Sequence, residues 1–361
     1  RPRPRADAMM VIRPIEARDF PALVRFAYES GHGFTSLPKN EPQLQVRIER
    51  ARQAFQEGPD ARGNAGFLFV MEDSDTGAVV GTSGIEARVG TEDAVYHYHL
   101  SKVVHTSREL GIHNTVDVLT LCNDYSGATE ICTLFLTPEA RQRRNGFLLS
   151  RFRFLFMAQH PLFFADTVMA EMRGVSDEDG RSPFWGWLQK HFFSMDLADA
   201  VHRVGMGQKS FIAELMPHYP VYVSLLDEAA QAVIGKVHAQ TVPALRMLER
   251  EGFLWRGYID PFDAGPTVEA RREAIGSVAA SWEETVTVVD RLPPESPTAL
   301  LTNGECAGFR ATLAGYRVDD HGTLQIDAAT AAALRTESGA RLRALSLPAR
   351  QLREWREEHA A

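Results

Sequence analysis

The fold is decided by residues 134–149, which read Leu134-Phe-Leu136-Thr137-Pro138-Glu-Ala-Arg141-Gln-Arg143-Arg144-Asn145-Gly146-Phe147-Leu-Leu. The stretch begins inside a predicted strand, 130–136, and Thr137 with Pro138 is a favourable start for one helical turn. Asn145-Gly146 would weaken a continuous helix, so we expect a loop before the long apolar helix at 146–159. A further predicted strand at 167–172 completes the strand, helix, strand order of a crossover unit.

The rest of the chain predicts a mixed α+β fold. Apolar spacing indicates strands at 10–14, 66–71, 78–89, 94–104 and 253–259, and helices at 16–28, 41–55, 226–234 and 241–251. The turn-rich region between 174 and 220 is interpreted as an insertion. Beyond Ser281 only short β-like runs follow, at 298–301, 309–318, 323–326 and 341–347.

Length and these patterns predict two domains, since a domain holds roughly 150 residues. We expect a main domain at 9–280 and a small β-rich domain at 281–349 that supplies no catalytic group. Residues 1–8 are expected to be a disordered extension or an early start site, and residues 350–361 a charged helix or tail.

Composition and charge disfavour several classes of partner and site. The 39 Lys and Arg against 47 Asp and Glu give a net charge of −8, so nucleic acid is not an expected partner. Cys122, Cys132 and Cys306 form no CxxC pair, which disfavours a disulfide framework or thiolate metal site and favours a reducing compartment. We see no secretory signal, and polar breaks interrupt the most apolar stretch, 147–164, so we expect a cytoplasmic protein without a membrane span.

Arginines gather where the crossover helix begins. Arg141, Arg143 and Arg144 would repel the positive end of the helix dipole, and an anion such as a diphosphate bound there would remove that cost. The alternative is a solvated basic loop, which composition alone favours.

The spacing Arg141-x-x-Arg144-x-Gly146 resembles the pyrophosphate loop of the GNAT superfamily of acyl-CoA N-acyltransferases, with Arg144 in place of the first glycine. Residues 241–253 resemble the last helix of that fold and match it at Ala244, Gly252 and Phe253. Leu248 stands where that family often has the tyrosine that protonates the departing thiolate. The resemblance implies a mixed sheet flanked by helices.

A resemblance over nearly the whole chain is more specific. Seven ordered segments are similar to the arginine N-succinyltransferase family, namely 33–38 (GFTSLP), 170–174 (AEMRG), 182–185 (SPFW), 192–195 (FFSM), 211–217 (FIAELMP), 234–238 (IGKVH) and 262–266 (FDAGP). The resemblance implies a GNAT-like fold with a small C-terminal β-barrel. It also implies transfer of succinyl from the co-substrate succinyl-CoA to the α-amine of arginine, or in some members ornithine, with no bound cofactor. In that family the residue matching His238 is the proton donor and the one matching Leu134 contacts succinyl-CoA.

The chemistry of the residues agrees with this reading. A free amine attacks a thioester directly, so the enzyme needs a ternary complex and proton handling rather than a nucleophilic side chain. His238 near a helix start should be neutral at pH 7, and could accept a proton from the amine and give one to the thiolate. A backbone N–H near Leu134 could stabilise the oxyanion. The alternative for His238 is a solvated or locally hydrogen-bonded side chain.

Two sets of binding residues follow. The candidates for succinyl-CoA are Leu134, Leu136, Arg141, Arg144, Asn145, Gly146 and Phe147. The candidates for the substrates are Glu171, Asp177, Glu178, Glu214 and Asp263 for the guanidinium and Arg173 for the succinyl carboxylate, since a guanidinium prefers a carboxylate partner.

Two alternatives stay open. The acceptor could be ornithine or another amine, and the chain could be a weakly active paralogous subunit of a heteromeric enzyme; a homo-oligomer or a hetero-oligomer is expected. His97 and His99 have the spacing of metal ligands on one strand face, but without an evident third ligand we interpret them as polar residues of a cleft or sheet face and expect no metal.

Overall fold

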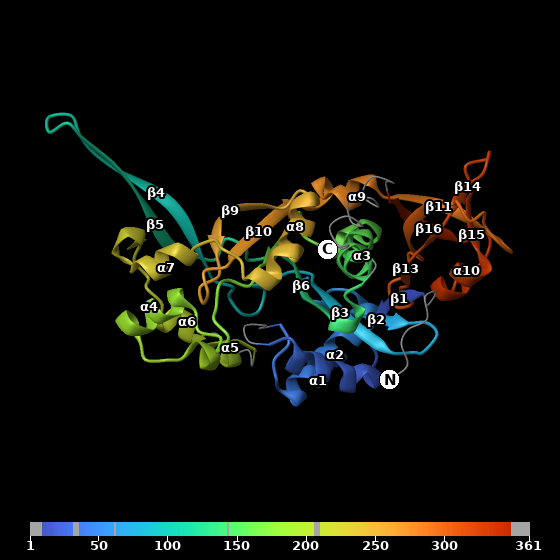
Figure 1. Ribbon diagram of the computed structural model, residues 1–361, viewed down its shortest axis with the longest axis horizontal. Helices are drawn as coiled ribbons and strands as arrows, with labels where there is room; N and C mark the ends of the chain where they lie inside the picture. Colours follow the sequence, from blue (N-terminus) through green and yellow to red (C-terminus); the bar gives the residue numbers. More distant parts are fainter. Residues whose placement is uncertain (1–8, 32–35, 61–62, 143, 206–209, 348–361) are drawn as a thin grey trace.

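The computed structural model describes residues 9–31, 36–60, 63–142, 144–205 and 210–347 (Figure 1). The expectations for residues 1–8 and 350–361, and for Arg143 in the arginine-rich loop, lie outside these residues.

One sheet joins the strands of the described chain, in the order β14, β15, β11, β16, β12, β13, β1, β2, β3, β6, β7, β10, β9, β4, β5 and β8. The strands are β1 (Met10–Pro14), β2 (Gly66–Asp73), β3 (Val79–Glu86), β4 (His97–Ser107), β5 (Ile112–Cys122), β6 (Thr129–Leu136), β7 (Thr167–Glu171), β8 (Val221–Tyr222), β9 (Leu254–Ile259), β10 (Pro266–Arg271), β11 (Trp282–Val289), β12 (Thr298–Thr302), β13 (Ala311–Gly315), β14 (Arg317–Val318), β15 (Leu324–Asp327) and β16 (Arg341–Ser346). Paired neighbours are antiparallel except β6 with β7 and β11 with β15. The expected α+β fold, a mixed sheet flanked by helices, is confirmed.

Helices cover this sheet along its length (Figure 1). They are α1 (Phe20–Glu29), α2 (Glu41–Glu57), α3 (Asn145–Gln159), α4 (Pro183–Phe192), α5 (Leu197–Gly205), α6 (Ser210–Leu215), α7 (Glu228–Val233), α8 (Val242–Arg250), α9 (Gly276–Ala280) and α10 (Ala328–Leu334). Helix α2 shows why the sequence folds this way locally. The Asn40 side chain accepts the backbone N–H of Gln43 at its start, and Gly58, with φ of 76°, ends it.

Helix α3 is the centre of the main core. Phe152, Phe154 and Phe156 are fully buried. The ring of Phe309, from the C-terminal part of the chain, packs 5.1 Å from Phe156 and 5.4 Å from Phe69 of β2. The C-terminal strands therefore share a core with the N-terminal ones.

The segment interpreted as an insertion forms a second apolar cluster. Helices α4 to α6 pack there with α7, which follows the segment, with Tyr98 of β4 and Ile259 of β9, and with Phe262 of the loop after β9. Strands β4 and β5 form a long hairpin that reaches away from the rest of the molecule (Figure 1). No strand was expected at β5, because its first residues are exposed on both faces and show no apolar alternation.

The small C-terminal β-barrel is not confirmed, because the C-terminal strands continue the main sheet as an open structure. Strand β13 pairs with β1, with Val11 opposite Thr312, and on its other side with β12. The unpaired N–H and C=O groups at the edge of a strand can pair with another strand. Here the edge of β1 pairs with β13. The sequence contains no local signal for that long-range pairing.

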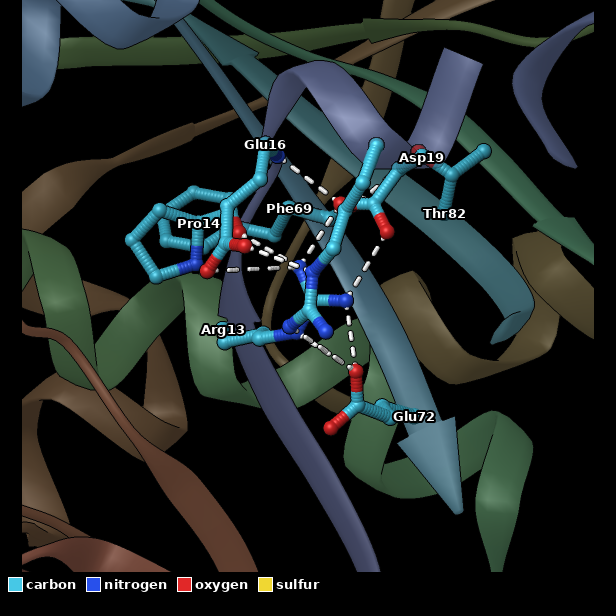
Figure 2. A network of polar contacts seen from close by, with 8 residues as sticks. Arg13, Pro14, Glu16, Asp19, Phe69, Glu72 and Thr82 are labelled. Atoms are coloured by element: carbon cyan, nitrogen blue, oxygen red, sulfur yellow. Dashed lines mark hydrogen bonds and ion pairs between the residues drawn. The ribbon is translucent and has the colours of Figure 1, made fainter. Parts of the chain in front are cut away.

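A buried arginine of β1, Arg13, links this strand to Glu72 of β2 and to Asp19 (Figure 2). The guanidinium of Arg13 donates to both carboxylate oxygens of Asp19, at 2.7 and 2.9 Å, and to Oε2 of Glu72. Burial opposes the charged form, but the hydrogen bonds to Asp19 and Glu72 outweigh it and raise the pKa of Arg13. The buried Arg13 and Asp19 and the partly buried Glu72 thus form one hydrogen-bonded set.

Candidate active site

Strands β6 and β7 separate soon after they meet. They are parallel, and their pairing consists of Thr129 with Val168 and Glu130 with Met169. Beyond these pairs β6 follows β3 and β7 follows β10. The expected strand, helix, strand crossover is confirmed, and the strands part toward their carboxyl ends.

An irregularity in β6 lies where the strands part. The register between β3 and β6 shifts between the pairs Gly84 with Cys132 and Thr82 with Phe135, and Thr133 has φ of 57°. This is a β-bulge, which leaves a backbone residue out of the ladder. Arg47 of α2 donates to the Thr133 hydroxyl at 2.9 Å and so holds the bulge in place. The sequence did not predict it, because threonine rarely adopts positive φ.

The arginine-rich loop lies between β6 and α3, as expected. A 3-10 turn, Pro138–Ala140, begins it, and Arg144 is the N-cap of α3 but makes no capping hydrogen bond with its side chain. Nε of Arg141 donates to the carbonyl of Leu136 at 3.0 Å. A Cβ on Gly146 would meet no heavy atom within 4 Å, so the protein itself does not require glycine there. The space beside the first turn of α3 fits the approach of an anionic ligand.

The other candidates for succinyl-CoA differ in exposure. The Asn145 side chain is buried and donates to the carbonyl of Ala140 at 3.1 Å, so it closes the loop internally. Leu134, Leu136 and Phe147 are partly buried and pack against the main core. Both their backbone groups and the accessible parts of their side chains can therefore face a ligand.

Two of the segments that carried the family resemblance, 170–174 and 262–266, meet at Asp263, and a third, 234–238, joins them through the Gly235 N–H, which donates to the Ala264 carbonyl at 2.9 Å. The Asp263 carboxylate accepts the backbone N–H of Gly174 at 2.7 Å and that of Gly265 at 2.8 Å. A Cβ on Gly174 would lie 2.5 Å from the Asp263 carbonyl oxygen, so only glycine allows this approach. Burial is the main cause that raises the pKa of Asp263 to about 6, against the lowering effect of the two backbone hydrogen bonds. The neighbouring Asp260 carboxyl also has its pKa raised by burial.

His238 lies at the carboxyl end of β7. Its backbone N–H donates to the Arg173 carbonyl at 2.9 Å, and the preceding Val237 forms an isolated bridge with Gly174. It is the N-cap of a short 3-10 turn that leads into α8, and its Nδ1 accepts the backbone N–H of Gln240 at 3.3 Å. Burial, and then the charge of Arg173, lower the pKa of His238. The ring is therefore neutral at pH 7, with Nε2 as the nitrogen that the loop does not use.

The side chain of Arg173 is half-buried beside this histidine. One terminal nitrogen donates to the Ser176 hydroxyl at 3.0 Å, and its buried Nε has no hydrogen-bond partner among the described residues. Burial lowers the pKa of Arg173, and the Asp263 charge opposes this shift. Such a cation retains donors for an anionic substrate group.

Glu171, the last residue of β7, faces a buried histidine. Its Oε1 lies 3.0 Å from Nε2 of His97, which is fully buried on β4, and neither ring nitrogen of His97 makes a hydrogen bond to a described residue. The His97 ring packs 5.0 Å from Tyr125, whose hydroxyl donates to Glu269. Spacing alone led us to interpret His97 as a polar residue of the sheet; the sequence held no sign of its contact with Glu171.

The remaining carboxylates do not join this group. Asp177 accepts the backbone N–H of Arg181 and closes its own exposed turn, which also contains Glu178. Glu214 is exposed on α6. In the part of the chain that the structure describes, no three His, Cys, Asp or Glu side chains could hold a metal ion, and no helix is long and apolar enough to cross a membrane.

Comparison with known proteins agrees with this arrangement. Residues 10–277 match the family model described as arginine N-succinyltransferase beta subunit, and residues 284–346 match that of its C-terminal domain. The arginine N-succinyltransferase of Citrobacter koseri is 46% identical over 344 residues, which cover 95% of this chain and 99% of the relative. That of Escherichia coli O127:H6 is 46% identical over 346 residues, with the same coverage.

A solved structure is similar over almost the whole chain. Arginine/ornithine succinyltransferase subunit AI from Pseudomonas aeruginosa is 36% identical, superposes with a TM-score of 0.85, and the match covers 94% of this chain and 99% of that one. The segments that meet at Asp263 are thus part of a fold shared along its full length. This chain belongs to the arginine N-succinyltransferase family.

Proposed function

We propose that this chain transfers the succinyl group of succinyl-CoA to the α-amine of L-arginine. The observation that carries the proposal is the meeting of residues 170–174, 234–238 and 262–266 at the place where β6 and β7 part. The carboxyl ends of parallel strands lie at the same edge, so His238 and Arg173 stand beside the opening. The names of the relatives at 46% identity support the choice of acyl donor and acceptor.

Succinyl-CoA is proposed to enter between the parted strands. The unpaired edges of β6 and β7 offer backbone groups to an extended ligand, as in recognition by strand addition. The diphosphate would then lie at the start of α3, near Arg141, Arg144, Asn145, Gly146 and Phe147. At the bulge, a backbone N–H at Leu134 would donate to the oxyanion, with Leu136 further along the strand.

The chemical step needs one proton to leave the amine and one to reach the sulfur. The amine nitrogen forms a bond to the thioester carbon, and the carbon–sulfur bond breaks as the oxyanion collapses. Because Nδ1 of His238 accepts a hydrogen bond, the neutral ring carries its proton on Nε2. The proton that the amine loses is proposed to reach Nδ1 through solvent, in place of the 3.3 Å hydrogen bond from Gln240, and the resulting imidazolium then gives its Nε2 proton to the departing thiolate, which leaves the ring neutral again.

The substrates are proposed to divide between two charged side chains. Glu171, held beside His97, is the carboxylate proposed for arginine, and Arg173 is proposed for the succinyl carboxylate. Asp263 is proposed to position the loops, because backbone N–H groups occupy its oxygens. Glu214 remains a weaker candidate on its exposed helix.

The experiment that tests the function is thiol release by the purified chain. With succinyl-CoA, L-arginine should give faster turnover than lysine, and succinyl-CoA should be a better donor than acetyl-CoA. Ornithine is the acceptor alternative, supported by the name of the Pseudomonas aeruginosa subunit. Equal turnover with acetyl-CoA would rule out the proposed donor, and turnover that appears only with a second subunit would favour the paralogous-subunit alternative.

A second prediction concerns the acceptor site. Glu171→Gln should lower kcat/KM for arginine by roughly 10- to 100-fold, the effect of losing a charge-assisted hydrogen bond of about 1.5–3 kcal/mol. KM for succinyl-CoA should stay within about twofold. Glu178→Gln, on the exposed turn, is the matched control and should behave as the wild type. An unchanged kcat/KM in a folded Glu171→Gln protein would remove Glu171 from the site.

Organisation of the chain is also proposed. The division at 9–280 and 281–349 is supported by the separate matches of the two family models, although both parts share one core. A further subunit is proposed to cover the β4–β5 hairpin, since a two-stranded ribbon alone is marginally stable and Val104, Leu110 and Ile112 are exposed there. A cytoplasmic location is proposed from the three free cysteines.

A further inference from the structure

A second site of interest lies between the two ends of the described chain. A pocket of about 160 Å³ is lined by residues of β1 and α2 on one side and by residues 307–310 and Arg335 on the other. It shares no residue with the candidate active site. Its size is well below the roughly 300–1,000 Å³ of pockets for drug-sized ligands, so it suits a small molecule.

Arg310 is an unusual residue for the wall of a pocket. It is only 8% exposed, and its backbone N–H donates to Asn303. Its guanidinium has no hydrogen-bond or ion-pair partner among the described residues. None of its nitrogens is both fully buried and unpartnered, so the group reaches the pocket, where it has lost part of its water and an anion would supply a partner.

The charges around Arg310 repel it more than they attract it. Burial lowers the pKa of Arg310, and the next causes are the positive charges of Arg335 and Arg13, which also lower it. Glu72 and Glu16 act in the opposite direction but more weakly. Both are already engaged, Glu72 by Arg13 and Glu16 by Arg18 at 2.7 Å.

Arg335 adds a second cation at a strained position. It follows α10 as the C-cap with φ of 51°, a conformation that favours glycine or asparagine. An L-residue in this conformation is strained, because its Cβ lies close to the backbone carbonyl oxygen. The side chain of Arg335 lines the pocket and has no ion pair to any residue that the structure describes.

Both walls of the pocket are held by hydrogen bonds. On one side the Arg13, Asp19 and Glu72 network fixes β1 (Figure 2). On the other, the Asn303 side chain donates to the carbonyls of Gly308 and Leu334, at 2.9 and 3.1 Å, and so joins the loop that carries Arg310 to the end of α10. A ligand would therefore bind to a largely preformed site, which reduces the entropy cost of binding.

We propose that this pocket binds a small dianion, inorganic phosphate or a short dicarboxylate, through the guanidiniums of Arg310 and Arg335. Arg52, paired with the exposed Glu49, stands at the rim, and Phe55 supplies an apolar wall. Two guanidiniums without anionic partners match two negative charges. A bound dianion would join the N-terminal strands to the C-terminal segment and stabilise the fold.

The test measures thermal unfolding and calorimetric titration of the full chain with sodium phosphate or sodium succinate, against sodium chloride at equal ionic strength. At least one of the two dianions should raise Tm saturably. Arg310→Met, which keeps an apolar stem, should weaken that binding at least tenfold. Arg317→Met, an exposed arginine of β14 outside the pocket, is the matched control and should bind as the wild type does.

Arg335→Gly keeps the proposal testable if Arg310→Met fails to fold. It removes both the charge and the backbone strain, so without dianion its Tm should equal or exceed that of the wild type while its affinity for the dianion falls. Stability and binding then change in opposite directions. The proposal is overturned if neither dianion gives a saturable response, or if the response is the same in the wild type, Arg310→Met and Arg335→Gly, as a general effect of excluded salts would be.

Discussion

Replacing His238 with alanine should lower kcat by roughly 10²- to 10⁴-fold, the range for loss of a general acid or base. Leu248 is buried where the wider superfamily often has a tyrosine acid, so that route is closed. Nε2 of His238 is the ring nitrogen left for the substrate, and burial, followed by the charge of Arg173, lowers the pKa of the ring. Steady-state kinetics should show little change in KM for succinyl-CoA, because the residue does not lie on the loop proposed for the diphosphate.

His238→Asn separates proton transfer from a structural role. Asparagine is a good N-cap and can accept the backbone N–H of Gln240 as Nδ1 does now, but it cannot donate an acidic proton. If His238 transfers the proton, both variants lose activity to a similar extent. If its role is only to cap the turn, His238→Asn keeps near-normal kcat while His238→Ala unfolds more easily, and the proposed donor is wrong.

The local parts of this fold could be predicted from the sequence. The crossover β6, α3, β7 and the helix α2 were predicted because each has its apolar pattern, its cap or its terminating glycine within one segment. Strand β5 was missed because its first half is exposed on both faces and so lacks the alternation that marks a strand. Strand β10 was also missed, although it is mostly buried. Exposure therefore does not explain why no strand was predicted there.

The candidate site was harder to predict because its geometry depends on contacts between distant residues. The hydrogen bond from Gly174 to Asp263 spans 89 residues, and Glu171 reaches His97 on another strand. Residue types suggested Glu171, Arg173 and Asp263 as candidates for substrate binding. They did not show that the Asp263 carboxylate instead accepts backbone N–H groups from two loops. The bulge at Thr133 has no sequence signal, because the contacts with Arg47 and the neighbouring strand impose it.

The second large effect is expected on stability, at Arg13. Arg13→Met should lower the free energy of unfolding by about 3–5 kcal/mol, the usual cost of removing one partner from a buried ion pair. Asp19 is 3% exposed and would lose the guanidinium that binds both its oxygens. The denaturation midpoint in urea measures the loss, provided that the slope is unchanged.

Arg18→Met is the matched control, because Arg18 meets the same Glu72 at 3.6 Å but is 62% exposed. Exposed ion pairs contribute about 0–1 kcal/mol, so this variant should unfold close to the wild-type midpoint. A loss below about 1 kcal/mol for Arg13→Met would mean that water or a shift of β1 compensates the two carboxylates. Since β1 also pairs with β13, a large loss would instead show that this one guanidinium supports the joint at which the N-terminal and C-terminal strands become a single sheet.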